Sequence, residues 1–268
     1  MCRVMAARKS ILVFDSGLGG LTVYREIAAA RPDADYLFVA DDAAFPYGEK
    51  KESALVERVV GLMGDLIAAH HPDLVVIACN TASTIVLPDL RKAFTLPFVG
   101  TVPAIKPACA SSQTRRVSVL GTEATVRREY TRALIRDYAE GCEVTLVGSK
   151  QLAAFAEAEL SGTAASDDEL REEIAPCFRD GGARTDTVVL ACTHYPLLLD
   201  RLAKLSPWPV SFLDPAPAIA RRVVSLLGDE PAAGHGSTRA IFTSGRLPEK
   251  ALRHFGIAQS AAEAASAR

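Results

Sequence analysis

The sequence predicts an α/β protein that consists of two pseudo-symmetric, doubly wound domains with mainly parallel sheets. Short apolar runs alternate with segments of helical period, a pattern typical of parallel strands covered by helices on both faces. The 268 residues suffice for two domains, and one stretch of the sequence echoes another. Residues 55–67 and 152–160 carry their apolar side chains largely on one helical face. The predicted strands are residues 11–14, 36–40, 74–78, 117–120, 144–147 and 188–191.

The internal echo places one cysteine in each half. The stretch from Asp73 to Cys79 shares the pattern Asp-x-Val-Val-apolar-Ala-Cys with the stretch from Asp186 to Cys192. Each cysteine therefore follows a buried strand, at the edge where open α/β sheets bind their ligands. If the halves face each other, both thiols point into one cleft, and we expect the active site there. One such cysteine could simply be buried, but a matched pair in echoing contexts favours a functional role.

A second echo predicts how the chain is divided. The segment 98–105 resembles the segment 212–219, at nearly the same separation as the two cysteines. We interpret the two segments as equivalent crossovers between domains. The predicted domains are residues 1–98 with 213–268, which carry Cys79, and residues 99–212, which carry Cys192.

The composition argues against several classes of function. With 23% charged residues and a net charge of −2, the chain has no long-range field that would attract nucleic acid. No run approaches the ~20 apolar residues of a membrane span, and residues 1–10 lack the features of a signal peptide. The six cysteines form no Cys-x-x-Cys pair, which disfavours a zinc site or a disulfide framework and favours a reducing cytoplasm. We expect no nucleic-acid, membrane or metal partner.

The residues after Cys192 suggest an activated thiol. Pro196 suits the first turn of a helix, so Cys192 is expected near a helix N-terminus. There the macrodipole and the exposed N–H groups favour thiolate over thiol. His194 is a candidate proton-transfer partner or carboxylate ligand, although a lone histidine is more often structural.

The residues around Cys79 and after the first strand suggest a site for a small polar ligand. Asn80, Thr81 and Ser83 are typical of a helix start and can donate hydrogen bonds to a carboxylate. Asp15 and Ser16 lead into a glycine-rich turn, which lacks both Gly-x-Gly-x-x-Gly and a Walker lysine, so a nucleotide-phosphate site is disfavoured. Asp15 could instead cap a helix, and Asp41-Asp42 with Pro46-Tyr47-Gly48 could form a simple turn.

Taken together, these motifs resemble the aspartate/glutamate racemase family, and within it the glutamate racemases. The resemblance implies cytoplasmic conversion of L-glutamate to D-glutamate for bacterial peptidoglycan, and so for cell-wall biogenesis and cell shape, without pyridoxal phosphate or any other cofactor. It covers roughly residues 11–219, and the set in this order is highly specific. The motifs are Phe-Asp15-Ser16-Gly-Leu-Gly-Gly, Phe-Pro46-Tyr47-Gly48, Ala-Cys79-Asn80-Thr81-Ala-Ser, Val-Pro103-Ala, Gly121-Thr122-x-x-Thr125 and Ala-Cys192-Thr193-His194-Tyr-Pro.

The resemblance also implies a role for each motif residue. Cys79 serves the D-enantiomer and Cys192 the L-enantiomer, with Asp15 and His194 assisting the thiols and contacting the substrate. Glu157 falls near a family glutamate that helps one cysteine, through a loose local alignment. The implied substrate-holding residues are Ser16, Tyr47, Gly48, Asn80, Thr81 and Thr193.

Two thiols suit the inversion of an α-carbon, because hydrogen must leave one face and arrive on the other. One thiol starts as thiolate, and the two exchange protonation states at each turnover. Asn80, Thr81 and Thr193 are candidates for stabilising the carbanion through its carboxylate. Closure of the cleft would exclude water, so we expect domain motion during turnover.

Two alternatives remain open at the level of sequence. A related two-cysteine racemase could act on aspartate or a hydantoin, because the chemistry depends on the α-carbon; a related decarboxylase would need only one of the cysteines. A non-catalytic amino-acid-binding regulatory protein could share the scaffold, but it would not need paired thiols. The sequence leaves the oligomeric state open, with a homodimer among the states allowed.

Overall fold

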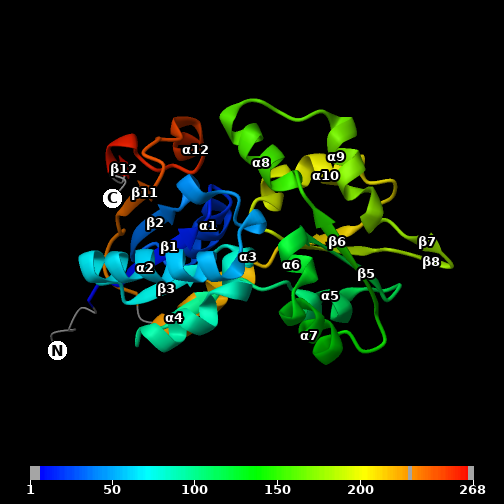
Figure 1. Ribbon diagram of the computed structural model, residues 1–268, viewed down its shortest axis with the longest axis horizontal. Coiled ribbons are helices and arrows are strands. Elements are labelled where there is room, and N and C mark those ends of the chain that lie inside the picture. The colour runs from blue at the N-terminus through cyan, green and yellow to red at the C-terminus, as the bar shows by residue number, and fades with distance from the viewer. Residues whose placement is uncertain (1–6, 229–230, 265–268) are drawn as a thin grey trace. The chain divides into compact units, whose positions relative to one another are not determined.

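The computed structural model describes residues 7–228 and 231–264, which fold into two compact α/β units (Figure 1). Unit 1 extends to Thr101 and resumes at Ala216, and unit 2 runs from Val102 to Pro215. The principal sheet of each unit is parallel, which confirms the predicted fold class. The sequence divided the chain into residues 1–98 with 213–268 and residues 99–212. That these segments are independently folding domains stays a prediction.

Unit 1 is built on a six-stranded parallel sheet in the order β12-β11-β2-β1-β3-β4. The central strand β1 is buried on both faces; Leu12 and Phe14 pack in a cluster with Val59 and Met63 of α2, and α3 and α4 complete that face. Helices α1 and α11 pack on each other at the other face. The strands are β1 (Ser10–Asp15), β2 (Asp35–Ala40), β3 (Leu74–Ile77), β4 (Phe98–Gly100), β11 (Thr238–Phe242) and β12 (Ala262–Ala264). The helices are α1 (Gly20–Ala30), η1 (Asp42–Ala44), η2 (Tyr47–Glu49), α2 (Glu52–His70), α3 (Asn80–Ile85), α4 (Leu87–Ala93), α11 (Ala216–Leu227), α12 (Glu249–His254) and η5 (Gln259–Ala261).

Unit 2 is built on a four-stranded parallel sheet in the order β10-β9-β5-β6, with a short antiparallel hairpin beside it. On one face, Leu190 packs with residues of α8, α9 and α10, and on the other, Val189 packs with α5 and α7. The strands are β5 (Arg116–Thr122), β6 (Glu143–Ser149), β7 (Asp180–Gly181), β8 (Ala183–Arg184), β9 (Thr187–Ala191) and β10 (Ser211–Leu213). The helices are α5 (Ile105–Ser111), α6 (Glu123–Arg127), α7 (Glu129–Tyr138), α8 (Leu152–Ser161), α9 (Asp167–Ile174), η3 (Ala175–Cys177), η4 (Tyr195–Leu198) and α10 (Leu199–Leu205).

The two sheets share one topology. The order β2-β1-β3-β4 in unit 1 corresponds to β6-β5-β9-β10 in unit 2, and the strands before the two cysteines, β3 and β9, occupy the same place. Unit 1 adds β11 and β12 beyond β2. The sequence echo therefore reflects a repeated sheet, extended at one edge in unit 1.

The aspartate that opens each echo binds the chain at the start of the neighbouring strand. Asp73 Oδ2 accepts a hydrogen bond from Ser10 N at 2.8 Å. Asp186 Oδ2 accepts hydrogen bonds from Gln113 N at 2.7 Å and Thr114 N at 2.9 Å, just before β5. These carboxylates fix where β1 and β5 begin, so the strand ends on the opposite edge are fixed as well.

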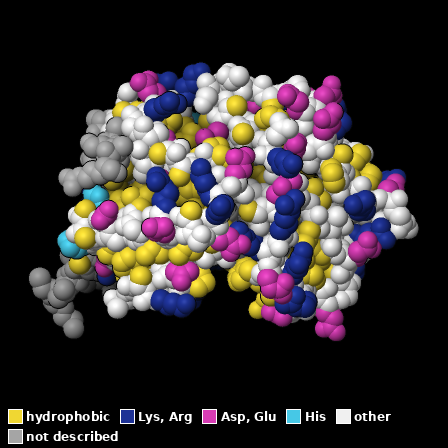
Figure 2. Space-filling view, viewed as in Figure 1, with side chains coloured by type: hydrophobic (Ala, Val, Ile, Leu, Met, Phe, Trp, Pro, Cys, Tyr) yellow, Lys and Arg dark blue, Asp and Glu magenta, His cyan; other side chains and the backbone are white. Residues whose placement is uncertain are grey.

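The face of the molecule in Figure 2 carries charged side chains of both signs. Acidic and basic side chains are interspersed over the face shown in Figure 2, in keeping with the net charge of −2. Within the described part of the chain, no helix combines the length and hydropathy that crossing a membrane requires.

We predict that Asp186→Ala lowers the free energy of unfolding by about 1.5–3 kcal/mol at pH 7, because it removes hydrogen bonds to a charged group. Urea denaturation measures the loss. The exposed Asp180, which pairs with Arg184, supplies the control, and Asp180→Ala should change stability by at most about 0.5 kcal/mol.

The stability conferred by Asp186 should depend on pH. Burial opposes its ionisation, but hydrogen bonds from Ser112, Thr114, Thr187 and Gln113 outweigh that effect and hold its pKa below the usual value. A lowered folded-state pKa stabilises the fold above the unfolded value of about 3.9, and this contribution is lost as pH falls through the folded value. The difference between Asp186→Ala and the parent should therefore shrink in acid; a difference that stays constant down to about pH 2 would contradict this explanation.

Candidate active site

In unit 1, Asp15 and Cys79 lie at the carboxyl edge of adjacent strands. Asp15 ends β1, and Cys79 follows β3 as the N-cap of α3, where its Sγ accepts a hydrogen bond from Ala82 N at 3.4 Å. Ser16 Oγ lies 3.5 Å from Cys79 Sγ and donates to Asp15 Oδ1 at 3.3 Å. A hydroxyl thus connects the thiol to a fully buried carboxylate.

The glycine-rich turn lets helix α1 approach Asp15. A Cβ atom at Gly20 would lie 2.6 Å from Asp15 Cβ, so a larger residue would displace the carboxylate. Asp15 Oδ1 also accepts a hydrogen bond from Gly17 N at 2.8 Å, within the turn that precedes the helix. The N-cap of α1 is Gly19, without a side-chain cap. The turn therefore holds Asp15 at the sheet edge.

The predicted substrate-holding residues of unit 1 lie close to this edge. Asn80 and Thr81 form the first turn of α3 and are buried. Neither the amide nitrogen nor the amide oxygen of Asn80 has a hydrogen-bond partner among the described residues. Tyr47 is buried and donates its hydroxyl to Asp41 Oδ2 at 2.5 Å, and Gly48 follows it in η2. A buried amide without partners is costly, and it fits a position that a polar ligand completes.

In unit 2, Cys192 belongs to a chain of three side chains. Cys192 Sγ lies 3.7 Å from His194 Nδ1, and His194 Nε2 lies 2.8 Å from Glu157 Oε1. A carboxylate only accepts hydrogen bonds, so Nε2 donates and the lone pair of Nδ1 in the neutral ring faces the thiol. Glu157, whose role the sequence left in doubt, is placed by α8 against His194. Thr193 is buried between Cys192 and His194.

The structure places a helix start close to Cys192, as the sequence predicted. Pro196 lies in the first turn of the 3-10 helix η4, whose N-cap is His194, and η4 leads directly into α10 at Leu199. Cys192 precedes the N-cap by two residues, and its backbone oxygen accepts a hydrogen bond from Tyr195 N at 3.2 Å. A helix dipole acts mainly within its first turn, so the contact with His194 is the nearer influence on the thiol.

Other predicted elements have structural roles. Thr122, in the family-like Gly-Thr motif, ends β5 and caps α6 by accepting a hydrogen bond from Thr125 N at 3.2 Å. The five cysteines within residues 7–228 are thiols rather than disulfides, and Cys2 lies outside the described residues. No group of three or more potential metal ligands occurs among the described residues.

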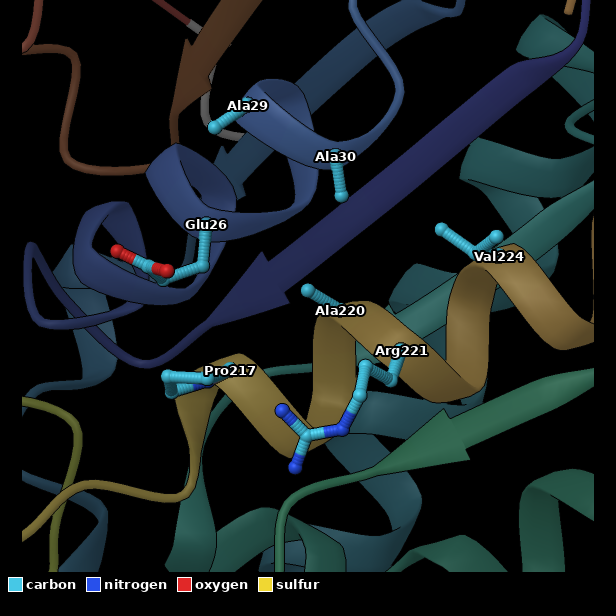
Figure 3. Close-up of a pocket in the computed structure, with 7 residues that line it drawn as sticks. All are labelled: Glu26, Ala29, Ala30, Pro217, Ala220, Arg221 and Val224. Atoms are coloured by element: carbon cyan, nitrogen blue, oxygen red, sulfur yellow. The ribbon is translucent and has the colours of Figure 1, made fainter.

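A pocket of about 340 Å³ lies between α1 and α11 and contains none of the predicted site residues (Figure 3). Glu26 and Arg221 are its charged lining residues, and the alanines at the centre let the helices approach closely. It is lined by Glu26, Ala29, Ala30, Pro217, Ala220, Arg221 and Val224.

Comparison with known proteins identifies the family. A model of the Asp/Glu/hydantoin racemases matches residues 11–223. The chain belongs to this family. It is 56% identical over 252 residues to a glutamate racemase of Brucella anthropi, a match that covers 92% of this chain and 90% of the relative. It is 55% identical over 251 residues to a glutamate racemase of Sinorhizobium medicae, covering 91% and 92% of the two chains.

Solved structures show the same fold. The Escherichia coli glutamate racemase, crystallised with L-glutamate and the activator UDP-MurNAc-Ala, is 40% identical, with a TM-score of 0.88 and coverage of 97% of this chain and 99% of that one. A glutamate racemase isoform of Bacillus anthracis is 25% identical, with a TM-score of 0.82 and coverage of 96% and 97%.

We predict that Asn80→Ala leaves the stability of the ligand-free protein unchanged or raises it, because the substitution removes an amide without partners. Thermal denaturation without ligand tests this. Ser83, on the same helix, donates its hydroxyl to the backbone oxygen of Ile77 at 2.8 Å and accepts a hydrogen bond from Thr101 N at 2.9 Å, so Ser83→Ala should destabilise by about 1–3 kcal/mol. Equal losses in the two variants would show that Asn80 is satisfied in the ligand-free protein.

We predict that Glu157→Gln slows alkylation of Cys192 by iodoacetamide at pH 7 by about tenfold, because the neutral amide no longer stabilises an imidazolium beside the thiolate. Site-resolved mass spectrometry measures the rate. Glu159 lies on the same helix and pairs with Arg201, so Glu159→Gln is the control and should leave the rate unchanged. Burial raises the pKa of Cys109 and of Cys177 to about 12, so these thiols should react little in either variant. An unchanged rate in Glu157→Gln would show that Glu157 only orients the ring.

Proposed function

We propose that this chain is a glutamate racemase in which Cys79 and Cys192 act on opposite faces of the substrate α-carbon, without a cofactor. The named relatives support glutamate over aspartate or a hydantoin. The observation that carries the mechanism is that a buried thiol follows each of two matched strands, and that each thiol contacts a polar side chain that is itself bonded to a carboxylate. A regulatory binding protein has no need of this second feature.

The proposed reaction from L-glutamate begins at Cys192. Its thiolate takes the α-hydrogen as a proton, which leaves a carbanion and a neutral Cys192 thiol. The Cys79 thiol then delivers its own proton to the opposite face, so D-glutamate forms and Cys79 becomes the thiolate. The reverse direction uses the same steps with the roles exchanged, and a proton must return to Cys79 before another L-glutamate is converted.

The neighbours of the two thiols are suited to these changes of charge. His194, held by Glu157, can accept a proton from the Cys192 thiol or stabilise its thiolate as an imidazolium. On the other side, the Ser16 hydroxyl donates its hydrogen to Asp15 Oδ1, so its oxygen can accept a hydrogen bond from the Cys79 thiol, and the Asp15 carboxylate disfavours a second negative charge nearby. We assign Asp15 and His194 to the catalytic set with the two cysteines.

The carbanion needs donors directed at its carboxylate. The Asn80 amide, which has no hydrogen-bond partner within the described part of the chain, is the strongest candidate, with Thr81 and Thr193 beside the two thiols. Ser16, Tyr47 and Gly48 complete the proposed substrate-holding set. We further propose a cytoplasmic, peptidoglycan-related role, because two reduced thiols are required and D-glutamate is a cell-wall precursor. A homodimer stays a prediction.

We predict that turnover of L-glutamate in deuterated water initially places deuterium in D-glutamate while the remaining L-glutamate stays largely protiated. The reason is that the hydrogen removed by one thiol and the hydrogen delivered by the other do not mix within one turnover. Chiral separation with mass spectrometry measures both labels, and starting from D-glutamate should reverse them. Equal early labelling of both enantiomers would rule out two separate bases.

Cys79→Ser and Cys192→Ser should each abolish racemisation, because a serine hydroxyl is too weak an acid to form an equivalent base near neutral pH. Cys142→Ser, which changes a half-buried thiol outside the proposed site, is the matched control and should retain near-parent activity. L-Aspartate offered in place of L-glutamate tests the alternative substrate.

A further inference from the structure

The loop that carries Tyr47 is held by Asp41, which the sequence analysis placed in a possible turn, and by partners of Asp41 that the sequence did not single out. Asp41 follows β2 directly and is fully buried, and its backbone N–H donates to Asp15 O at 2.8 Å. Arg58 of α2 forms a two-point ion pair with it, from Nε to Oδ2 and from Nη2 to Oδ1, both at 2.6 Å. Thr243, just after β11, donates its hydroxyl to Asp41 Oδ1 at 2.7 Å.

The fourth hydrogen bond to the Asp41 carboxylate comes from Tyr47, one of the proposed substrate-holding residues. Tyr47 donates its hydroxyl to Asp41 Oδ2 at 2.5 Å, so its hydrogen is committed and is not available to a substrate. What Tyr47 can offer a ligand is its ring edge and the backbone of its turn. Tyr47 packs in the same buried cluster as Cys79, and η2 packs against α3. The position of this turn relative to Cys79 therefore depends on Asp41.

We propose that Asp41, Arg58 and Thr243 act together as positioning residues, which hold Tyr47 and the Pro46–Gly48 turn in the place that substrate binding requires. This inference rests on the proposed racemase function, because it assigns Tyr47 and Gly48 to glutamate. None of the three residues needs to contact the substrate.

The charges of this cluster support the proposal. Burial opposes ionisation of Asp41, but the hydrogen bonds from Arg58, Tyr47 and Thr243 outweigh it, so its pKa lies below the usual value. Burial and the nearby charges of Asp41 and Cys79 raise the pKa of Tyr47 well above its usual value. Asp41 is therefore a permanent acceptor and Tyr47 a permanent donor at neutral pH, which gives the turn one fixed attachment.

The segment after β11 holds the same loop at further points. Thr243 Oγ1 accepts a hydrogen bond from Ala43 N at 3.1 Å, and Asp42 Oδ1 accepts one from Ser244 N at 2.8 Å. The Ser244 hydroxyl also donates to Asp42 Oδ2. The loop from Asp41 to Gly48 is thus held from α2 on one side and from the carboxyl end of β11 on the other.

Steady-state kinetics of Arg58→Met in the full chain test the proposal. Arg58 is 44% exposed, and methionine keeps much of its apolar stem while removing the ion pair. We expect KM for L-glutamate to rise about tenfold or more with kcat within about threefold, because a loosened binding turn weakens ground and transition states alike. Arg58→Lys keeps the positive charge without the two-point geometry, so its KM should lie between those of the parent and of Arg58→Met.

Two comparisons separate a positioning role from a purely structural role. Arg201→Met removes an ion-pair network in unit 2 whose acidic partners are more exposed than Asp41, and it should leave KM unchanged. The double variant Arg58→Met/Tyr47→Phe should be no worse in KM than the worse single variant, because both act through one attachment. If Arg58→Met fails to fold, Thr243→Val and the charge-balanced Arg58→Met/Asp41→Asn replace it, with folding checked by thermal denaturation.

The outcomes distinguish the two proposals. A parent protein that binds L-glutamate by calorimetry but does not racemise it refutes the proposed function, while the variants' Kd still tests positioning. A parent that racemises glutamate, with variants whose KM and Kd are unchanged, overturns the positioning role. Additive effects of Arg58→Met and Tyr47→Phe would likewise overturn it.

Discussion

The register between adjacent parallel strands is the constraint on which the candidate site depends. Cys79 is placed by β3 and Asp15 by β1, and these strands pair with Phe14 opposite Ile77. A shift by one residue would turn every side chain of a strand to the other face, so the thiol and the carboxylate would separate. Asp73 fixes that register from the opposite edge, and Asp186 does the same for β5 and β9 in unit 2. The echo thus joins a structural aspartate at one end of a strand to a candidate catalytic cysteine at the other.

The repeated scaffold carries two different chemical environments. Cys79 contacts a serine that is tied to a carboxylate, whereas Cys192 contacts a histidine that is tied to a carboxylate. In water a hydroxyl is a poor base and imidazole is a good one. The two thiols therefore need not exchange protons with their neighbouring side chains equally readily. The two units are therefore pseudo-symmetric in backbone topology, but the side chains that contact the two cysteines differ.

The sequence predicted the long buried strands and the cysteines but not the connections that position them. Short, mainly apolar runs identified β1, β2, β3, β5, β6 and β9, while β4, β10 and β12 are three residues long and owe their pairing to tertiary context. Arg58 looks like an ordinary exposed residue on an amphipathic helix, and nothing in its spacing indicates Asp41. Glu157 became interpretable only when α8 placed it on His194, and the helix expected near Cys192 begins as a 3-10 turn that leads into α10.

The position of β11 limits how far this protein can be shortened from its carboxyl terminus. The family model ends at residue 223, yet β11 begins at Thr238 and pairs with β2, and Thr243 reaches the buried Asp41. A fragment chosen by the limits of the family match would expose the edge of β2 and remove one of the groups around that carboxylate. Carboxyl-terminal fusions and truncations are therefore best designed to keep β11 and the residues that follow it, since this late segment completes a sheet that the first 40 residues begin.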